Sequence, residues 1–433
     1  MSGGVLVAGG RVVDPRYGID AVRDIYVSGG IIQQFPGDER GYHVFDATGM
    51  IVVPGLIDLH VHFREPGAEY KEDIESGSRA AARGGYTTVC CMPNTKPTID
   101  NKETVEFVNR RGRGVGLVNL LISGALSKRQ AGQELADFEG MLQGGISALS
   151  EDGKTLTDYT LMRRAAECAK GLGLLIMDHA EDDEISAGGV MNEGEASRKL
   201  GVRGIPNRSE SSIVARDIML ARETGCHIHL QHISTRESVS LIREAKGQGV
   251  SVTAETAPHY FVLTDEAVIT HGANAKMNPP LRTEFDRQAI VEALCDGTIE
   301  AIATDHAPHS AEEKSRPVDQ APFGIVGLET AFAISYTMLV MPGYITLPEL
   351  IRLMSVNPAD IMNLKRGGLA VGDTADFAVF DIANPYTIDC EKFVSKSKNT
   401  PFHGMNVYGK TALTACGGKV SYIMEDVNDR PFN

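Results

Sequence analysis

The chain has 433 residues, of which 42% are hydrophobic and 23% charged, a composition that excludes a disordered protein. Its length is about three times that of a typical domain, so we expect one large domain with a smaller appendage. The formal net charge of −15 argues against nucleic acid or an anionic membrane as a partner, because both would repel an acidic surface.

The N-terminal segment alternates apolar and polar residues, with glycines at the turns. Residues 5–13 and 24–27 have this pattern, which predicts short antiparallel strands. Residues 1–8 lack the basic and apolar segments of a signal peptide, and no later apolar run is long enough to span a membrane. The seven cysteines include no CxxC pair, which indicates reduced thiols. We therefore expect a cytoplasmic protein.

The middle of the chain alternates short apolar runs with helical stretches. Eight runs are candidate strands: 56–61, 87–92, 116–122, 146–149, 174–177, 226–230, 250–254 and 299–304. Helical stretches lie between most of them, at 72–83, 157–170, 209–223, 236–246 and 285–295. Since no GxGxxG motif follows the first run, this order favours a (β/α)₈ barrel over a doubly wound sheet.

The last part of the chain returns to strand-like alternation, at 376–381, 407–411 and 415–422. These segments resemble the N-terminal ones and can pair with them. We therefore predict an α/β protein in which residues 55–365 form the TIM-type barrel. Residues 1–54 and 366–433 are predicted to form a small β-sandwich domain from both chain ends.

Candidate metal ligands follow the predicted strands. His60 and His62 close the first run and point to the same face. Four more residues follow the fourth, fifth, sixth and eighth runs: Asp152, His179, His232 and Asp305. Barrel enzymes build their active sites at these strand ends, and such ligands suit Zn²⁺, Mn²⁺ or Co²⁺. Six ligands are too many for one tetrahedral zinc and fit a pair of metals about 3.5–4 Å apart.

Each of these signals has an ordinary structural alternative. An Asp after a strand is usually a helix cap or a turn residue, which applies to Asp152 and Asp305. His227 and His229 form a second His-x-His pair. By strand alternation they face away from the sixth-strand ligand, so we expect them to pack behind the barrel. For His259 we expect a structural hydrogen bond.

Three motifs carry a family resemblance: Gly-Leu-Ile-Asp-Leu-His-Val-His-Phe-Arg-Glu-Pro-Gly at 55–67, Met-Pro-Asn-Thr-Lys-Pro at 92–97 and Thr-Asp-His-Ala-Pro-His at 304–309. They resemble the signatures of the class I, bacterial-type dihydroorotases of the amidohydrolase superfamily. The similarity continues through 357–359 and 372–376. The Phe-Arg-Glu-Pro-Gly and Met-Pro-Asn-Thr stretches are narrower and separate dihydroorotases from hydantoinases and allantoinases.

The resemblance implies a zinc centre. It assigns one Zn²⁺ to His60, His62 and Asp305, a second to His179 and His232, and the bridging position to Asp152. Many relatives have a carbamylated lysine at that last position, and this sequence resembles the bacterial subset in which Asp bridges. An Asp is much shorter than a carbamyl-lysine, so a one-zinc enzyme stays open beside the favoured two-zinc one.

The resemblance also implies a reaction, the reversible cyclisation of N-carbamoyl-L-aspartate to L-dihydroorotate in pyrimidine (UMP) biosynthesis. Asp305 would be the catalytic proton shuttle. The implied substrate-binding residues are His62, Arg64, Asn94, Asn278, His309, Phe323 and Gly324. Arg64 suits the substrate carboxylate because a guanidinium binds it through two hydrogen bonds. The alternatives are a surface ion pair with Glu65 or Glu69 for Arg64 and a turn role for Asn94.

Other readings stay open. Residues 310–324 are rich in charge and proline and form either a lid or an ordinary solvated loop. The rival enzyme is another cyclic-amide hydrolase of the hydantoinase or allantoinase type. The rival non-enzyme is a catalytically inactive scaffold homologue, although such proteins usually lose the metal ligands that are present here. The expected partners are a small-molecule substrate, a second copy in a homodimer, and aspartate transcarbamoylase.

Overall fold

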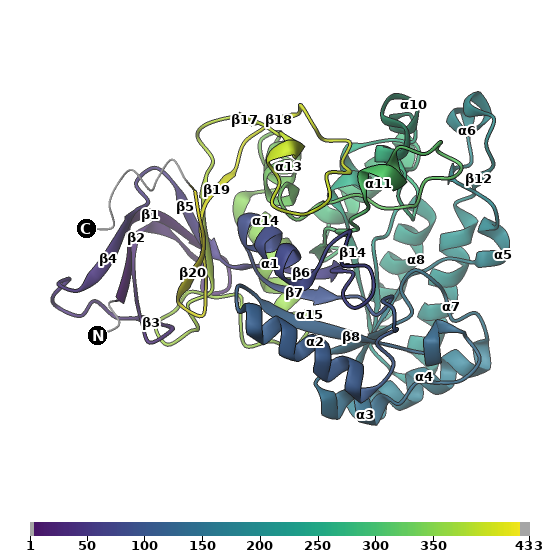
Figure 1. Ribbon diagram of the computed structural model, residues 1–433, viewed down its shortest axis with the longest axis horizontal. Coiled ribbons are helices and arrows are strands. Elements are labelled where there is room, and N and C mark those ends of the chain that lie inside the picture. Colours follow the sequence, from purple (N-terminus) through teal and green to yellow (C-terminus); the bar gives the residue numbers. More distant parts are fainter. Residues whose placement is uncertain (1–3, 425–433) are drawn as a thin grey trace.

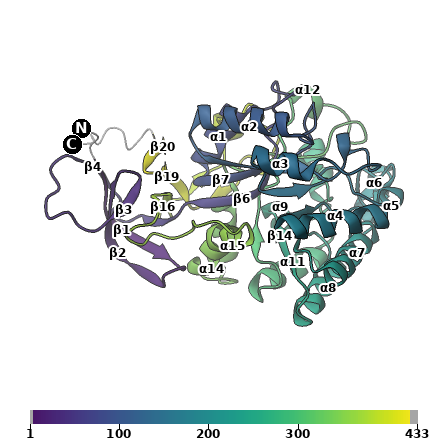
Figure 2. The same ribbon diagram turned by 90° about the horizontal axis from the view of Figure 1, so that it is seen from below.

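The computed structural model describes residues 4–424, and its larger part is a barrel surrounded by helices (Figures 1 and 2). Eight parallel strands form one sheet in the order β15-β14-β13-β10-β9-β8-β7-β6. They are β6 (Leu56–Val61), β7 (Tyr86–Cys91), β8 (Asn119–Ala125), β9 (Ala148–Ser150), β10 (Leu175–Asp178), β13 (Ile228–Leu230), β14 (Val252–Thr256) and β15 (Ala301–Ile302). The sheet nearly closes on itself, because His62 N donates to His306 O at 2.9 Å. The predicted TIM-type barrel is confirmed.

Helices cover the outside of the barrel, and further short helices lie within the segments that connect its strands. Their bounds are α1 (Ile74–Arg83), α2 (Lys102–Val115), α3 (Phe138–Gly144), α4 (Tyr159–Leu172), α5 (Asp183–Ser186), α6 (Glu195–Leu200), α7 (Arg208–Thr224), α8 (Arg236–Gly247), α9 (Pro258–Val262), α10 (Ala267–His271), α11 (Glu284–Cys295), α12 (Ala311–Lys314), α13 (Ala331–Ser335), α14 (Leu347–Ile351) and α15 (Asn357–Ile361). Helix α4 shows why they form: the Asp158 side chain caps its first turn, and Gly173 at φ 69° ends it. Within residues 4–424, none of these helices has the length and apolar character needed to cross a membrane.

The strands of the barrel separate two apolar layers. Ile57, Leu59 and Met177 belong to the cluster inside the barrel, whereas Leu56 and Ile176 pack outward against the helices. Successive residues of a strand face opposite sides of the sheet, so both layers need apolar residues. This explains the nearly unbroken apolar runs in the sequence.

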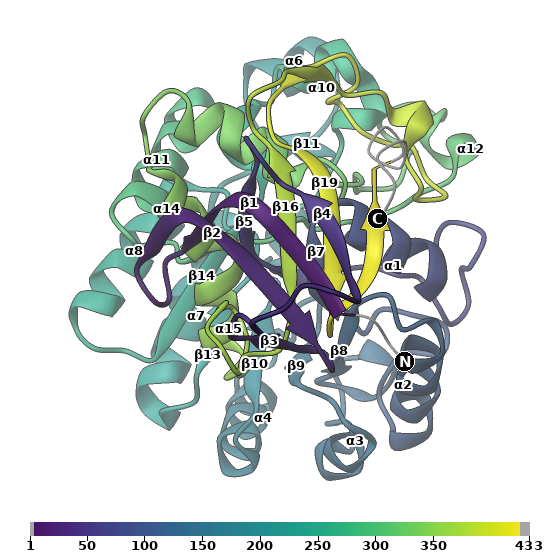
Figure 3. The same ribbon diagram turned by 90° about the vertical axis from the view of Figure 1, so that its left-hand side faces the viewer.

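A second eight-stranded sheet joins the two ends of the chain (Figure 3). Its strands are β1 (Gly4–Asp14), β2 (Ile19–Ser28), β3 (Ile31–Gln33), β4 (Tyr42–Asp46), β5 (Ile51–Pro54), β16 (Phe377–Asp381), β19 (Lys410–Cys416) and β20 (Lys419–Ile423). Strand β5 pairs parallel with β1 and antiparallel with β16. The fold class is therefore confirmed. The exact domain limits stay a prediction, and residues 1–3 and 425–433 lie outside the described chain.

The segment between β16 and β19 reaches over to the barrel. It contains the short antiparallel pair β17 (Tyr386–Thr387) and β18 (Asn406–Val407), which lies near α13 in Figure 1. Within this segment, Asn399 Nδ2 donates to Ala307 O at 3.2 Å and to Gly324 O at 3.0 Å. The C-terminal part of the chain thus supports the loop that follows β15.

Candidate active site

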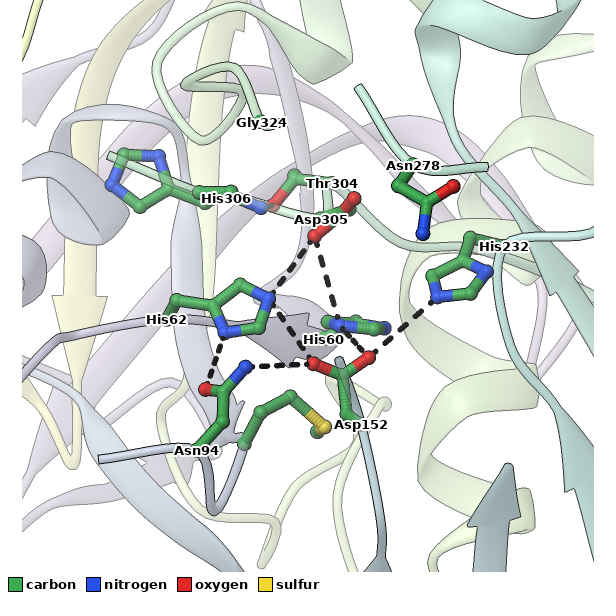
Figure 4. Close-up of polar contacts among 12 residues, drawn as sticks. His60, His62, Asn94, Asp152, His232, Asn278, Thr304, Asp305, His306 and Gly324 are labelled. Carbon is green, nitrogen blue, oxygen red and sulfur yellow. Dashed lines mark hydrogen bonds and ion pairs between the residues drawn. The ribbon is translucent and has the colours of Figure 1, made fainter. Parts of the chain in front are cut away.

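The predicted metal ligands converge at the C-terminal ends of the barrel strands, and Figure 4 labels all of them except His179. The buried carboxylate of Asp58 fixes the backbone at two of these strand ends. Its Oδ1 accepts hydrogen bonds from His60 N and from Thr304 N, each at 3.1 Å. The first strand of the barrel is thereby tied to the residue before Asp305. Two backbone amides share one carboxylate, which sets the relative height of His60 and Asp305.

Asp152 lies at the centre of the histidines. Its Oδ1 is 3.2 Å from His60 Nε2 and 3.7 Å from both His179 Nδ1 and His232 Nε2. Its Oδ2 is 3.5 Å from His62 Nε2. One carboxylate therefore faces all four imidazoles, as a bridging ligand must.

Asp305 faces the first pair of histidines. Its Oδ1 lies 3.2 Å from His62 Nε2 and 3.6 Å from His60 Nε2. Burial opposes the ionisation of Asp305, but the hydrogen bond from His62 and the neighbouring imidazoles hold its pKa below the usual range. Asp305 is therefore a carboxylate that can bind a cation or accept a proton.

The donor atoms fit a metal ion. His60, His62 and Asp305 form one compact group of donors, and His60, Asp152 and His232 form another. His60 Nε2 is buried without a hydrogen-bond partner in the described chain. Burial lowers the pKa of His62 and His232, which favours the neutral imidazole that donates a lone pair.

The pKa values of His60 and His179 are instead raised, because carboxylates next to these two imidazoles outweigh the effect of burial. Burial opposes the charged form of His60, but Asp152 and Glu255 raise its pKa well above its usual value. His179 lies with Nδ1 2.9 Å from His232 Nε2. Nitrogen lone pairs brought this close, beside the oxygens of Asp152, suit a shared cation. These buried clusters of His and Asp residues suit metal binding.

Polar partners fix the outer nitrogens of two histidines. His62 Nδ1 lies 3.0 Å from Asn94 Oδ1, and Asn94 Nδ2 donates to Asp152 Oδ2 at 3.2 Å. His60 Nδ1 lies 3.4 Å from Glu255 Oε1. Such partners orient the ring and leave the inner nitrogen free to bind. Asn94, predicted as a substrate residue, thus also contacts two predicted metal ligands.

Three site residues have left-handed backbone conformations: Arg64 at φ 58°, His232 at φ 33° and Asp305 at φ 46°. Such values cost non-glycine residues on the order of 1–3 kcal/mol and are concentrated at functional sites. The turn at each residue directs its side chain into the mouth of the barrel and interrupts the strand alternation.

The predicted carboxylate-binding residues lie together beside this centre. Arg64 Nε donates to Pro308 O at 3.2 Å, and its Nη2 lies 3.4 Å from His309 Nε2. The alternative partner Glu65 binds Arg111 instead, at 2.7 Å. Burial and the charges of Arg64 and Lys71 lower the pKa of His309 to about 2, so its ring is neutral.

The predicted residues Phe323 and Gly324 lie next to His309. His309 Nε2 is 2.8 Å from Phe323 O, and Gly324 N donates to Lys276 O at 2.9 Å. Asn278 lies on the other side of the mouth, with Nδ2 3.5 Å from His179 Nε2. The structure thus brings Asn278 to the second histidine pair and the loop residues to Arg64.

Two buried lysines hold the loop 310–324 against the barrel. Lys314 Nζ donates to Gly324 O at 2.8 Å and to Pro322 O at 3.0 Å. Lys276 Nζ donates to the carbonyls of Val318 and Ala321, each at 2.6 Å. The loop is therefore docked and internally bonded, and it is not a freely solvated segment.

The prediction that His227 and His229 pack behind the barrel is wrong for His229. Its Nε2 lies 3.1 Å from Glu255 Oε2, and Glu255 also contacts the predicted ligand His60. The alternation argument fails because His232 itself has a positive φ, which reverses its direction. Likewise, His259 Nε2 is buried without the expected hydrogen-bond partner in the described chain.

Several charged residues at the mouth were missed by sequence reasoning. Glu181 contacts His179 and Asn278, Lys71 and Glu313 flank His309, and Lys276 and Lys314 hold the loop. The available signal was their position shortly after strand ends or within the charged loop. Single charged residues in loops are usually solvated, so this signal is weak.

Solved structures with the same architecture are cyclic-amide hydrolases. An L-hydantoinase (dihydropyrimidinase) from Arthrobacter aurescens is 26% identical and matches with a TM-score of 0.84 over 96% of this chain and 95% of that one. A D-hydantoinase (dihydropyrimidinase) from a Thermus species is 25% identical, with a TM-score of 0.84 over 97% and 96%. Barrel and site together define a cyclic-amide hydrolase of the amidohydrolase superfamily.

Sequence comparison narrows this class. A family model described as dihydro-orotase-like matches residues 49–238. The dihydroorotase of Geobacter metallireducens is 49% identical over 421 residues, which cover 96% of this chain and 99% of the relative. That of Ruminiclostridium cellulolyticum is 46% identical over 416 residues, covering 96% and 97%. The chain belongs to the dihydroorotase family, as its motifs predicted.

Proposed function

We propose that this enzyme interconverts N-carbamoyl-L-aspartate and L-dihydroorotate at a centre that binds two Zn²⁺ ions. The observation that carries the proposal is the placement of Arg64, 3.4 Å from His309, beside the cluster of imidazoles and carboxylates. Hydantoins have no carboxylate, whereas dihydroorotate offers one to a guanidinium. The identity of nearly half of all residues with named dihydroorotases supports the same choice.

The proposed zinc ligands are His60, His62 and Asp305 for one ion, His179 and His232 for the other, and Asp152 for both. When bound, zinc supplies Lewis acidity to a carbonyl and lowers the pKa of coordinated water from 15.7 to about 7. The central position of Asp152, within 3.2–3.7 Å of all four imidazoles, supports a bridging role.

The chain's own residues then bind and move protons. Asp305 is ionised and lies beside His62, so it can accept the proton of the attacking water and return it to the ring nitrogen that leaves. Arg64, His309 and Asn94 bind the substrate carboxylate. Asn278 and the backbone of Phe323 and Gly324 contact the ring. In the biosynthetic direction the same groups act in reverse.

The test is an assay of the purified, zinc-loaded protein in both directions, with metal analysis of the same sample. We expect turnover of dihydroorotate to exceed that of hydantoin, allantoin and dihydrouracil, and a chelator to abolish it until zinc returns. Preferred hydrolysis of hydantoin or allantoin would support the rival enzyme. Bound zinc without any turnover would support an inactive scaffold.

Cytoplasmic location, a homodimer, association with aspartate transcarbamoylase and the lack of nucleic-acid binding remain predictions. The net charge of −15 supports the last of these predictions, and the association with aspartate transcarbamoylase is supported by the resemblance described above. Size-exclusion chromatography with and without added transcarbamoylase tests the two assembly predictions together.

A further inference from the structure

Glu181 occupies a position that none of the motifs includes. It follows β10 by three residues, and its carboxylate lies between His179 and Asn278. Its Oε2 lies 3.1 Å from His179 Nε2 and 2.6 Å from Asn278 Nδ2. One oxygen atom thus serves a predicted zinc ligand and a predicted substrate residue at once.

The contact determines which nitrogen of His179 carries the proton. Oε2 of Glu181 already accepts a hydrogen bond from Asn278 Nδ2, so it faces His179 Nε2 as an acceptor, and a donating Nε2 leaves the lone pair on Nδ1. Nδ1 is the atom that faces His232 Nε2 at 2.9 Å and Asp152 Oδ1 at 3.7 Å. His60 and His62 instead present Nε2 to Asp152. The inner nitrogen of His179 is therefore Nδ1, whereas that of His60 and His62 is Nε2.

The backbone around Glu181 is also fixed. Thr155, which lies three residues beyond Asp152, donates from Oγ1 to His179 O at 2.8 Å and accepts from Glu181 N at 3.2 Å. The side chain of Glu181 is only 13% exposed. Its carboxylate is thus held by neighbours on two loops and does not swing freely into solvent.

The same carboxylate orients the amide of Asn278. Asn278 Nδ2 donates to Glu181, which fixes which end of the amide faces the carboxylate. Because both contacts share Oε2, a shift of Glu181 moves the metal ligand and the substrate residue together. The outer partner of His62 differs in charge, because it is the neutral amide of Asn94.

We propose that Glu181 is a positioning residue that selects the metal-binding tautomer of His179 and holds Asn278 toward the substrate. The inference rests on the proposed function, since it concerns the zinc ion assigned to His179 and His232. Outer partners of this kind typically change metal affinity by about 10–100-fold. Glu181 would thus be needed for the second zinc ion and not for the first.

The test measures zinc affinity by chelator competition, without turnover, in the full chain. We expect Glu181→Ala to lower the affinity for one of the two zinc ions by about 10–100-fold. The affinity for the other zinc ion should stay within about threefold of the wild-type value. Glu181→Gln keeps an acceptor of the same size and should lose less than about tenfold. Exposed Glu184, in the adjoining helix α5, gives the control variant Glu184→Ala, which should match the wild type.

Asn278→Ala separates the two parts of the proposal. It should raise KM for dihydroorotate as Glu181→Ala does, while both zinc affinities stay at the wild-type level. Wild-type zinc affinities in Glu181→Ala, or an equal loss at both positions, would overturn the inference. A protein without dihydroorotase turnover that still shows the Glu181 effect on zinc would reject the proposed function and keep the inference.

Discussion

The metal-ligand side of the mouth and its substrate side are held in place by different means. The proposed ligands stand at strand ends, where Asp58 ties β6 to the residue preceding Asp305. The proposed substrate residues Arg64, His309 and Phe323 lie in loops, which are supported by the half-buried Lys71 and the buried Lys314. A strand is fixed by its sheet, whereas a loop needs side chains to satisfy its carbonyls. The proposed catalytic residues are thus positioned by the barrel strands, and the proposed substrate-binding residues are positioned by the loops.

Asn94 connects the two sides. Its amide contacts both His62 and Asp152, although it belongs to the loop after β7. If the division holds, changes at strand ends lower kcat, and changes in the loops raise KM with kcat nearly kept. The following variants test it, in order of decreasing effect.

The largest effect is expected for Asp305→Ala. Removing the proton shuttle should lower kcat by about 10³–10⁴-fold, since general acid–base catalysis contributes on the order of 10²–10⁴ and a metal ligand is lost as well. Circular dichroism should show a folded protein. Turnover close to that of the wild type would rule out the shuttle role.

Arg64→Met tests recognition alone. Losing a charged, bidentate hydrogen-bond donor costs about 1.5–3 kcal/mol, so KM for dihydroorotate should rise about 10–100-fold. Zinc content should stay unchanged, because Arg64 contacts His309 and the backbone of Pro308 rather than a proposed ligand. An unaltered KM would contradict the carboxylate-binding assignment.

Lys314→Met tests the support of the loop. Three carbonyls lose the hydrogen bond from Lys314 Nζ, although Gly324 O keeps the one from Asn399 Nδ2, so we expect KM to rise about tenfold with little change in kcat. The control is Arg316→Met, since the side chain of Arg316 is half exposed on the same loop. Equal effects of both variants would show that the buried lysine has no special role.

The same variant tests how the stability of the protein depends on pH. Burial, reinforced by Lys276, lowers the pKa of Lys314 from 10.5 to about 7. Between these values the unfolded chain binds more protons than the folded one, so this group makes stability rise with pH. The unfolding midpoint of the wild type relative to Lys314→Met should therefore increase between pH 7 and about 10.5. A constant difference would contradict the lowered pKa.

The smallest effect is expected for Tyr70→Phe. The Tyr70 hydroxyl donates to Glu313 Oε1 at 3.0 Å, but the ring is 65% exposed. An exposed hydrogen bond contributes at most about 1 kcal/mol, so KM should change less than about fivefold. Lys71, which also binds Glu313, keeps the loop docked in this variant. A large rise in KM would show that the hydrogen bond from Tyr70, and not Lys71, holds the loop in place.

Much of the fold was predictable because its signals are local. The apolar runs of the barrel are short and nearly unbroken, since each strand packs on both faces. The helix expected at 236–246 is α8 (Arg236–Gly247), and the one expected at 285–295 is α11 (Glu284–Cys295). Strand limits differ more, as for the run 299–304, where only Ala301 and Ile302 pair as a strand.

The errors have one physical source. Alternation failed at His232 because its left-handed backbone reverses the direction of the side chain, and the sequence gives no sign of a positive φ at a histidine. Glu181 and Lys314 were missed because a charge in a loop carries no pattern. Their roles follow from burial and from partners far along the chain, such as Asn278, which lies 97 residues from Glu181.

The sequence by itself determined the barrel, the family and the residues that stand at its strand ends, because parallel strands carry their C-terminal residues to a common edge. Only the tertiary structure decided how those residues share atoms. It placed both oxygens of Asp152 among four imidazoles, and it turned Nδ1 of His179 toward Asp152 where His62 presents Nε2. Such contacts depend on distances of a few tenths of an ångström between strands and loops, which local patterns do not specify.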